Sequence, residues 1–287
     1  MTDGAGREYE VQRAGEYAHE EMAMRARIKG MRAWLAAIGV ILAVAVMVPP
    51  GGTTASRYVF AQAVQFSVLA IVVPALVVLG APWRQVAALL GKRGNDLADR
   101  AAIRRSHRPS RARPLLILVT FIAVALAWRL PVAVNSLVRY PALTAAEAVT
   151  LIGTGCMLWL ELVDSPPFLP RITRPQRAAF AAVPMWSLWA SAYIMGFSGT
   201  DWFSALAHSA GHGLGTLADQ EIAAGLLWAI PGLCFVPVVY FSAITWLRDS
   251  ANLDDDLRGV HDGQRVPGLP QPPRGWRLPP PEPRRPA

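Results

Sequence analysis

Six polar residues lie within or at the ends of long apolar runs, where they could bind a ligand or an ion. They are Gln62, Gln65, Arg129, Glu147, Asp219 and Gln220. Amide and charged side chains are costly in hydrocarbon unless they face protein or water. An arginine and a glutamate at similar depth on consecutive spans should pair, because either alone would be an uncompensated charge. We therefore predict an Arg129–Glu147 ion pair, which either fixes helix packing or belongs to a ligand-binding site.

Two histidines could bind a metal ion. His208 and His212 are four residues apart, a spacing that would place two imidazoles on one face of a helix. Three glycines in the same stretch disfavour a helix there, at positions Gly211, Gly213 and Gly215. Both interpretations stay open: solvated loop histidines, or an outer-loop metal site.

Sulfur side chains offer a second set of metal ligands. Cys156, Met157, Met185 and Met195 could bind Cu(I), although methionine in a helical bundle is more often a gap filler. The chain has two cysteines, Cys156 and Cys234, and they form no C-x-x-C pair. The sequence therefore indicates neither a disulfide framework nor a cysteine zinc site.

The composition places these residues in a membrane protein. Of 287 residues, 53% are hydrophobic and 17% are charged, and the mean hydropathy is +0.30. The sequence pI is near 10.2, but Lys and Arg gather between the apolar runs and at the termini, as orientation signals do, so nucleic acid is not an expected partner. We find no Ser-His-Asp set, P-loop or nucleotide-binding glycine motif in a suitable context, and we predict that the protein is not an enzyme.

Six apolar runs are candidate membrane spans. They lie at about 33–48, 59–80, 114–134, 143–163, 178–197 and 221–246. A signal peptide is the competing interpretation of the first run, but its charged leader would be unusually long and no A-x-A cleavage site follows. We predict an all-α integral membrane protein with a bundle of about six transmembrane helices. Its parts are a cytoplasmic N-terminal segment (1–33), the transmembrane domain (34–250) and a Pro-rich, disordered cytoplasmic tail (251–287).

The charge distribution predicts the orientation. All but three of the 28 Lys and Arg residues fall on one side of this topology, the exceptions being Arg57, Arg129 and Arg139. The positive-inside rule then makes both termini cytoplasmic. We also predict that the basic segment 81–113 is a solvated cytoplasmic loop rather than a binding patch. The six polar residues all lie toward the outer face, in one layer.

Several motifs resemble a known family. These are AQAVQFSVLAIVVPALVVLGAP in the second run, WRLP at 128–131, TAAEAV at 144–149, and ADQEIAAGLLWAIPG at the start of the last run. In this order and spacing they resemble the CtaG family of cytochrome c oxidase assembly proteins, over roughly residues 34–250. The resemblance implies a polytopic helical bundle of the bacterial plasma membrane, associated with maturing the copper site of haem–copper oxidases.

The chain departs from the family at the positions that would bind copper. Where the family carries histidine, this sequence has Gln62, Phe66, Arg129, Thr144 and Ala148. It keeps the family's Gln65, Glu147, Asp219 and Gln220. Neutral imidazoles suit copper, whereas a guanidinium in the same layer repels a metal cation. The resemblance thus implies a retained scaffold from which imidazole copper binding is lost.

The resulting expectation is a protein similar to oxidase assembly factors that binds or scaffolds haem–copper oxidase subunits within the lipid bilayer. The first alternative is a copper-handling protein that uses His208 and His212; copper is the one candidate cofactor. The second alternative is a small-molecule transporter, prompted by the broken spans and the intramembrane charges. A transporter predicts an internal repeat and a continuous polar path, and the sequence indicates neither.

Overall fold

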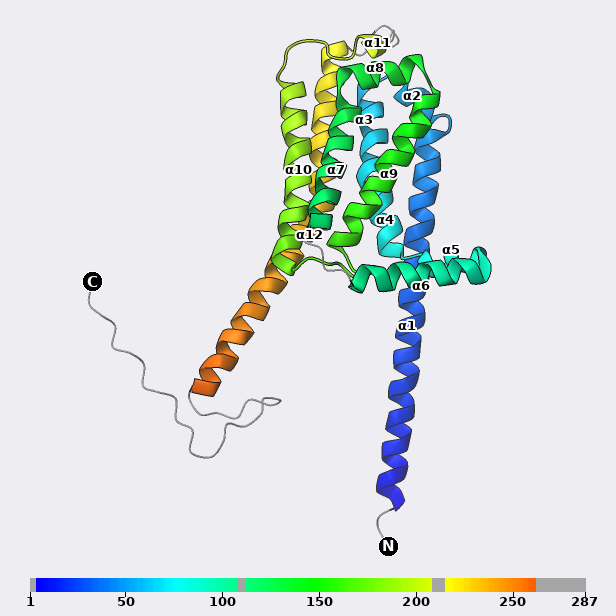
Figure 1. Cartoon of the computed structure of the whole chain (residues 1–287), viewed down its shortest axis with the longest axis vertical. Helices are drawn as coiled ribbons and strands as arrows, with labels where there is room; N and C mark the ends of the chain where they lie inside the picture. The colour runs from blue at the N-terminus through cyan, green and yellow to red at the C-terminus, as the bar shows by residue number, and fades with distance from the viewer. Residues whose placement is uncertain (1–3, 108–111, 208–214, 262–287) are drawn as a thin grey trace, which may run out of the picture. The chain divides into compact units, whose positions relative to one another are not determined.

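The computed structural model describes residues 4–107, 112–207 and 215–261, and in these residues the fold consists of helices joined by loops (Figure 1). The elements are α1 (Gly4–Met47), α2 (Gly51–Ala55), α3 (Val59–Ser67), the π-helix η1 (Val68–Val72), α4 (Val73–Gly80), α5 (Trp83–Leu89), α6 (Gly91–His107), α7 (Ala112–Arg129), α8 (Pro131–Arg139), α9 (Ala142–Leu162), α10 (Arg174–Gly196), α11 (Ser204–Ala207) and α12 (Thr216–His261). The predicted all-α class is confirmed for these residues.

Six helical segments of the described chain are long and apolar enough to cross a membrane, which confirms the predicted number. They are Met22–Met47, Val59–Gly80, Ala112–Arg129, Ala142–Leu162, Arg174–Gly196 and Thr216–Ala251. The side of the membrane on which each end lies stays a prediction from the charge distribution.

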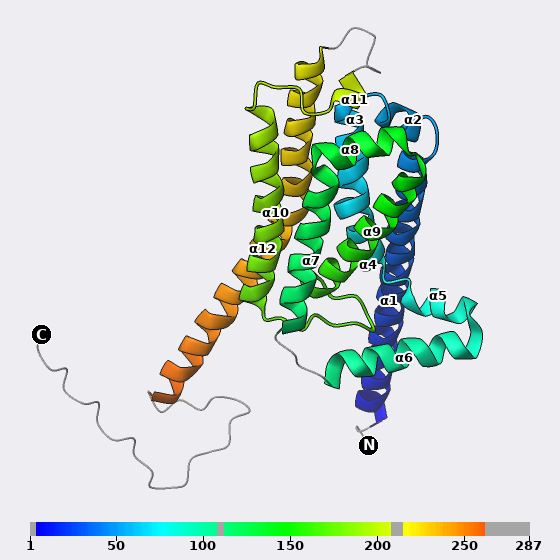
Figure 2. The same ribbon diagram turned by 45° about the horizontal axis from the view of Figure 1, so that its top comes forward.

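The chain divides into two compact units, Met1–Ala243 and Ile244–Ala287. The first unit holds the core and every residue discussed below, including α12 as far as Ala243. Its centre is the segment Val59–Gly80, of whose apolar window 67% is buried, against 33% or less in the other candidate spans. Both views place α3 and α4 among α1, α7 and α9 (Figures 1 and 2).

A π turn shapes this central segment where Pro74 enters it. Proline has no N–H, and its ring clashes with the carbonyl four residues earlier, here that of Ala70, so the helix widens locally at η1. α9 packs directly against this turn. A Cβ on Gly155 would lie 2.5 Å from the Ala70 carbonyl oxygen and 2.6 Å from Pro74 Cγ. Only glycine allows the two backbones to approach this closely.

The third span ends earlier than predicted. We expected one helix from 114 to 134, but α7 ends at Arg129 and α8 begins at Pro131. The reason is Pro131, because the residue before a proline avoids the helical region, and Leu130 is extended (φ −62°, ψ 140°). Arg129 is therefore the last helical residue of α7, where the helix dipole favours a cation.

The basic segment 81–113, predicted as a loop, instead forms α5 and α6 within the described residues. α6 runs across the direction of the spans in both views (Figures 1 and 2). We call the end of the first unit that carries α5, α6 and the 163–173 loop the basic end, and the end that carries α2, α8 and α11 the cluster end. At the basic end, Ser165 donates a hydrogen bond to the Val78 carbonyl and accepts one from Trp83 Nε1, which fixes the loop to α4 and α5.

The close approach at Gly155 gives a stability prediction. Gly155→Ala should destabilise the protein by about 1–3 kcal/mol, because the new methyl group meets backbone that cannot move aside. Gly153→Ala is the matched control on the same helix, since its Cβ would meet nothing within 4 Å. It should be neutral or stabilising by up to about 1 kcal/mol. Thermal unfolding in detergent measures both, and equal midpoints would contradict the proposed contact.

Candidate functional site

The guanidinium of Arg129 is enclosed at the cluster end. Arg129 is 6% exposed, and its Nη1 donates a hydrogen bond to Gln62 Oε1 on α3. Its Nη2 lies 3.5 Å from the sulfur of Met195 on α10. Two aromatic rings flank its Cζ, Phe66 at 5.4 Å and Phe203 at 5.5 Å from the ring centroids. Hydrogen bonds and ring faces thus replace the water that this cation has lost.

The buried carboxylate of Glu147 reaches Arg129 only through Gln62. The Nε2 of Gln62 lies 3.4 Å from Glu147 Oε1, while the Oε1 of the same amide accepts from Arg129. No direct ion pair joins the two charges, so the predicted Arg129–Glu147 pair is wrong in that respect. A primary amide can donate and accept at once, which allows it to link a cation to an anion. Glu147 is 0% exposed, and its Oε2 has no hydrogen-bond partner among the described residues.

Asp219 caps a helix from which it is distant in sequence. Its two carboxylate oxygens accept hydrogen bonds from the backbone N–H groups of Val59 and Phe60, both at 2.8 Å. These amides begin α3, whose own N-cap residue, Tyr58, provides no side-chain cap. An anion at a helix N-terminus is favoured by the free N–H groups and by the helix dipole. Asp219 therefore ties the start of α12 to the start of α3.

The two remaining glutamines of the predicted set bind backbone. Gln220 donates to the Met195 carbonyl at 2.9 Å and accepts from the N–H of Trp202 at 3.0 Å, which holds the segment between α10 and α11. Gln65 donates to the Val46 carbonyl at 2.8 Å, near the end of α1. The structure thus brings Gln62, Arg129 and Glu147 into one cluster, which we call the charge cluster.

The candidate metal ligands do not gather in the described chain. Met185 and Met195 are ten residues apart on α10, a rise of about 15 Å, and Met157 is 55% exposed. The sulfur of Met195 already contacts Arg129. Within the described ranges, no three His, Cys, Asp or Glu side chains are placed to hold a metal ion together. His208 and His212 lie outside the described residues.

Residues 17–249 match the family model for the cytochrome c oxidase caa3 assembly factor (Caa3_CtaG). The chain belongs to this family. Comparisons with curated proteins and with solved structures give no match. The matched region includes all the residues of the charge cluster, as well as Asp219 and Gln220.

Three of the five positions at which the resemblance implies histidine lie together in this structure. Arg129 hydrogen-bonds Gln62 and lies over the ring of Phe66, so three substituted positions contact one another. Ala148 is also buried, next to Glu147, and Thr144 is half-buried one turn earlier on α9. The oxygen of Gln62 and the sulfur of Met195 are engaged by the guanidinium, whose charge opposes a cation nearby. These residues do not fit a copper ion.

Sequence reasoning missed a second buried charge pair, at the basic end. Glu161 is 0% exposed, and Arg105 on α6 donates to it at 2.8 Å. Burial lowers the pKa of the Arg105 guanidinium, and the charge of Glu161 opposes that shift. The available signal was Glu161 itself, a carboxylate inside an apolar run that requires a cationic partner. The partner was missed because Arg105 lay in a segment predicted to be a solvated loop.

The charge cluster predicts strong coupling between its two ionisable groups. Arg129→Leu should destabilise the protein by about 3–5 kcal/mol, because it leaves the Glu147 carboxylate buried without a cation. Arg129→Leu/Glu147→Leu should recover most of that loss. Unfolding in SDS titrations of the two single variants and the double variant measures the coupling. Additive effects would show that the charges do not interact through Gln62.

The cap on α3 predicts a local effect. Asp219→Asn keeps the size of the side chain but replaces one acceptor oxygen with a donor, so one backbone N–H loses its partner. We expect faster hydrogen exchange at Val59 and Phe60 and a loss of about 1–3 kcal/mol. Glu221→Gln is the control, because it makes the same chemical change two residues later at an exposed position. Equal exchange in both variants would argue against the cap.

Proposed function

We propose that this Caa3_CtaG member acts in the bacterial plasma membrane as a scaffold for subunits of a maturing haem–copper oxidase, without carrying copper at the charge cluster. The family supports a role in cytochrome c oxidase assembly. The observation that carries the finer proposal is the environment of Arg129. The guanidinium occupies one of the positions at which the resemblance implies histidine, and it contacts Gln62, Phe66 and Met195.

The local contacts support a structural role for this cluster. The guanidinium has an amide, a sulfur and two ring faces as neighbours, which together replace its hydration. The cluster joins α3, α7, α9 and α10 at one end of the bundle. A rigid end of this kind can present a fixed surface to a partner without performing chemistry.

The described interior also favours scaffolding over transport. The cluster end is separated from the basic end by fully enclosed apolar side chains, those of Leu69, Ile71, Leu151 and Leu158. A transporter would need polar groups or water at this depth. The apolar middle of the bundle supports a static arrangement.

The test combines copper binding with restoration of the imidazoles. Purified wild-type protein, titrated with Cu(I) against a competing chelator, should show no stoichiometric binding at the cluster. A variant with Gln62→His, Phe66→His, Arg129→His, Thr144→His and Ala148→His should gain it, provided that it elutes as a monodisperse species. Stoichiometric binding by wild type that is lost in His208→Ala/His212→Ala would favour the copper-handling alternative instead.

A gene deletion experiment in cells tests the role in oxidase assembly. Deletion of the gene should lower oxidase activity, and added copper should not restore it, because the proposed contribution is to subunit association. Wild-type protein expressed in trans should restore activity, and oxidase subunits should be recovered with it after crosslinking. Rescue of the deletion strain by copper alone would overturn the scaffold proposal.

A further inference from the structure

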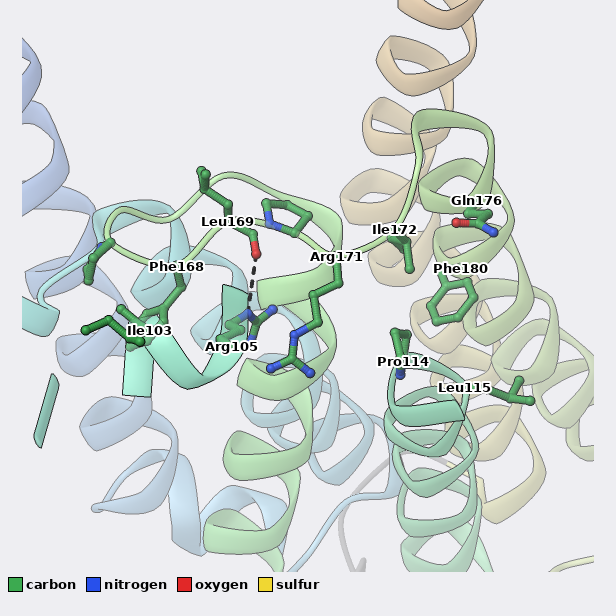
Figure 3. A pocket seen from close by; sticks show the side chains of 13 residues that line it. Ile103, Arg105, Pro114, Leu115, Phe168, Leu169, Arg171, Ile172, Gln176 and Phe180 are labelled. Atoms are coloured by element: carbon green, nitrogen blue, oxygen red, sulfur yellow. Dashed lines mark hydrogen bonds between the residues drawn. The ribbon is translucent and has the colours of Figure 1, made fainter. Parts of the chain in front are cut away.

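A cavity of about 610 Å³ opens at the basic end, away from the charge cluster. It lies between the C-terminal part of α6, the first residues of α7, the 167–172 segment and the start of α10 (Figure 3). Arg105 and Arg171 lie in the middle of the lining residues. Ile103 and Phe168 flank them on one side, and Pro114, Leu115 and Phe180 on the other (Figure 3).

Both carboxylate oxygens of Glu161, which contacts the cavity residue Arg105, have hydrogen-bond partners. Glu161 Oε1 accepts from Arg105 at 2.8 Å, and Oε2 accepts the backbone N–H of Arg171 at 3.1 Å. Arg105 also donates to the Leu160 carbonyl at 2.8 Å and to the Leu169 carbonyl at 3.3 Å. These contacts give Arg105 a structural role in fastening α6 to the end of α9.

The guanidinium of Arg171 takes no part in this network. It makes no hydrogen bond or ion pair with any described residue, and its Nε is buried without a partner. Asp164, the acidic residue of the 163–173 loop, pairs instead with Arg177 at 3.4 Å. Arg171 lies near enough to Arg105 for their charges to repel. Glu161 therefore pairs with the guanidinium of Arg105 alone, and the described lining of the cavity, which holds both arginines and no acid, has an excess of positive charge.

The side chains that line the cavity indicate that an anion bound there has an apolar part. Around the two arginines, the lining is formed by Ile103, Leu115, Phe168, Leu169 and Phe180. A free phosphate would gain nothing from such walls, whereas an amphiphile would bury its apolar part against them. Arginine is well suited to phosphate, because its planar donors match the phosphate oxygens.

The setting agrees with a lipid at the membrane surface. α7 and α10 begin at this cavity, so it lies where two candidate spans leave the hydrocarbon. α6 carries exposed apolar residues, Leu97 and Ile103, beside the exposed basic residues Arg100 and Arg104. This composition is typical of a helix in the interfacial plane of an anionic leaflet.

We propose that the Arg171 cavity binds the phosphate headgroup of an anionic phospholipid, with the glycerol and the upper acyl chains against its apolar walls. Arg171 supplies the free donors to the phosphate, and Arg105 supplies charge while it holds α6 in place. The proposal does not depend on copper binding or on the identity of the oxidase. It depends on the spans lying in a membrane.

The test is native mass spectrometry of the full chain released from nanodiscs made with equal amounts of phosphatidylglycerol and phosphatidylcholine. Wild type should retain phosphatidylglycerol in preference to phosphatidylcholine. Arg171→Gln should reduce the retained phosphatidylglycerol at least roughly tenfold, the effect of losing charge-assisted hydrogen bonds. Arg104→Gln is the control, because it removes the same charge from an exposed position on α6, next in sequence to Arg105. It should change retention little.

Two further arms distinguish the sources of the phosphate. Phe180→Ala should weaken retention of the lipid, because it removes an apolar wall and leaves both arginines. Millimolar inorganic phosphate should not displace the lipid from wild type. The proposal is overturned if Arg171→Gln, folded as judged by its thermal midpoint, retains as much phosphatidylglycerol as wild type. Displacement by inorganic phosphate, with no effect of Phe180→Ala, would also overturn it in favour of a free anion.

Discussion

Enclosure of the Arg129 guanidinium is the constraint on which the cluster end depends. A cation so far from water needs donors matched to acceptors, and the structure meets this need with an amide, a sulfur and two aromatic rings. The amide and one ring come from α3, the sulfur comes from α10, and the second ring is Phe203, just before α11. Arg129 therefore links α7 to α3 and α10, and the early end of α7 before Pro131 makes Arg129 the last residue of that helix.

The two ends of the first unit compensate an arginine and a buried glutamate in different ways. At the cluster end, Gln62 stands between the cation and Glu147, so the charges interact at a distance. At the basic end, Arg105 and Glu161 meet directly, and carbonyl groups take up the remaining donors of Arg105. The direct pair fastens an amphipathic helix to the bundle, and it leaves the guanidinium of Arg171 without an acceptor among the described residues.

Sequence patterns predicted the spans well and the contacts between them poorly. Hydropathy depends on composition along the chain, so six apolar runs were visible, and they gave an expected depth for each polar residue. Depth does not give the rotation of a helix about its axis. For that reason the insertion of Gln62 between Arg129 and Glu147 was not predictable, nor was the turn of Gln65 toward α1. The end of α7 was readable from Pro131. The pairing of Arg105 with Glu161 required knowledge that a charged connecting segment folds back as α6.

The Asp219 cap links two parts of the chain that the ribosome synthesises at different times. Val59 and Asp219 are separated by 160 residues, so the ribosome completes α3 long before the carboxylate that satisfies its first amides exists. Until then those N–H groups must be served by water or by the insertion machinery. The hydrogen bonds that cap α3 can therefore form only after the start of α12 has been synthesised.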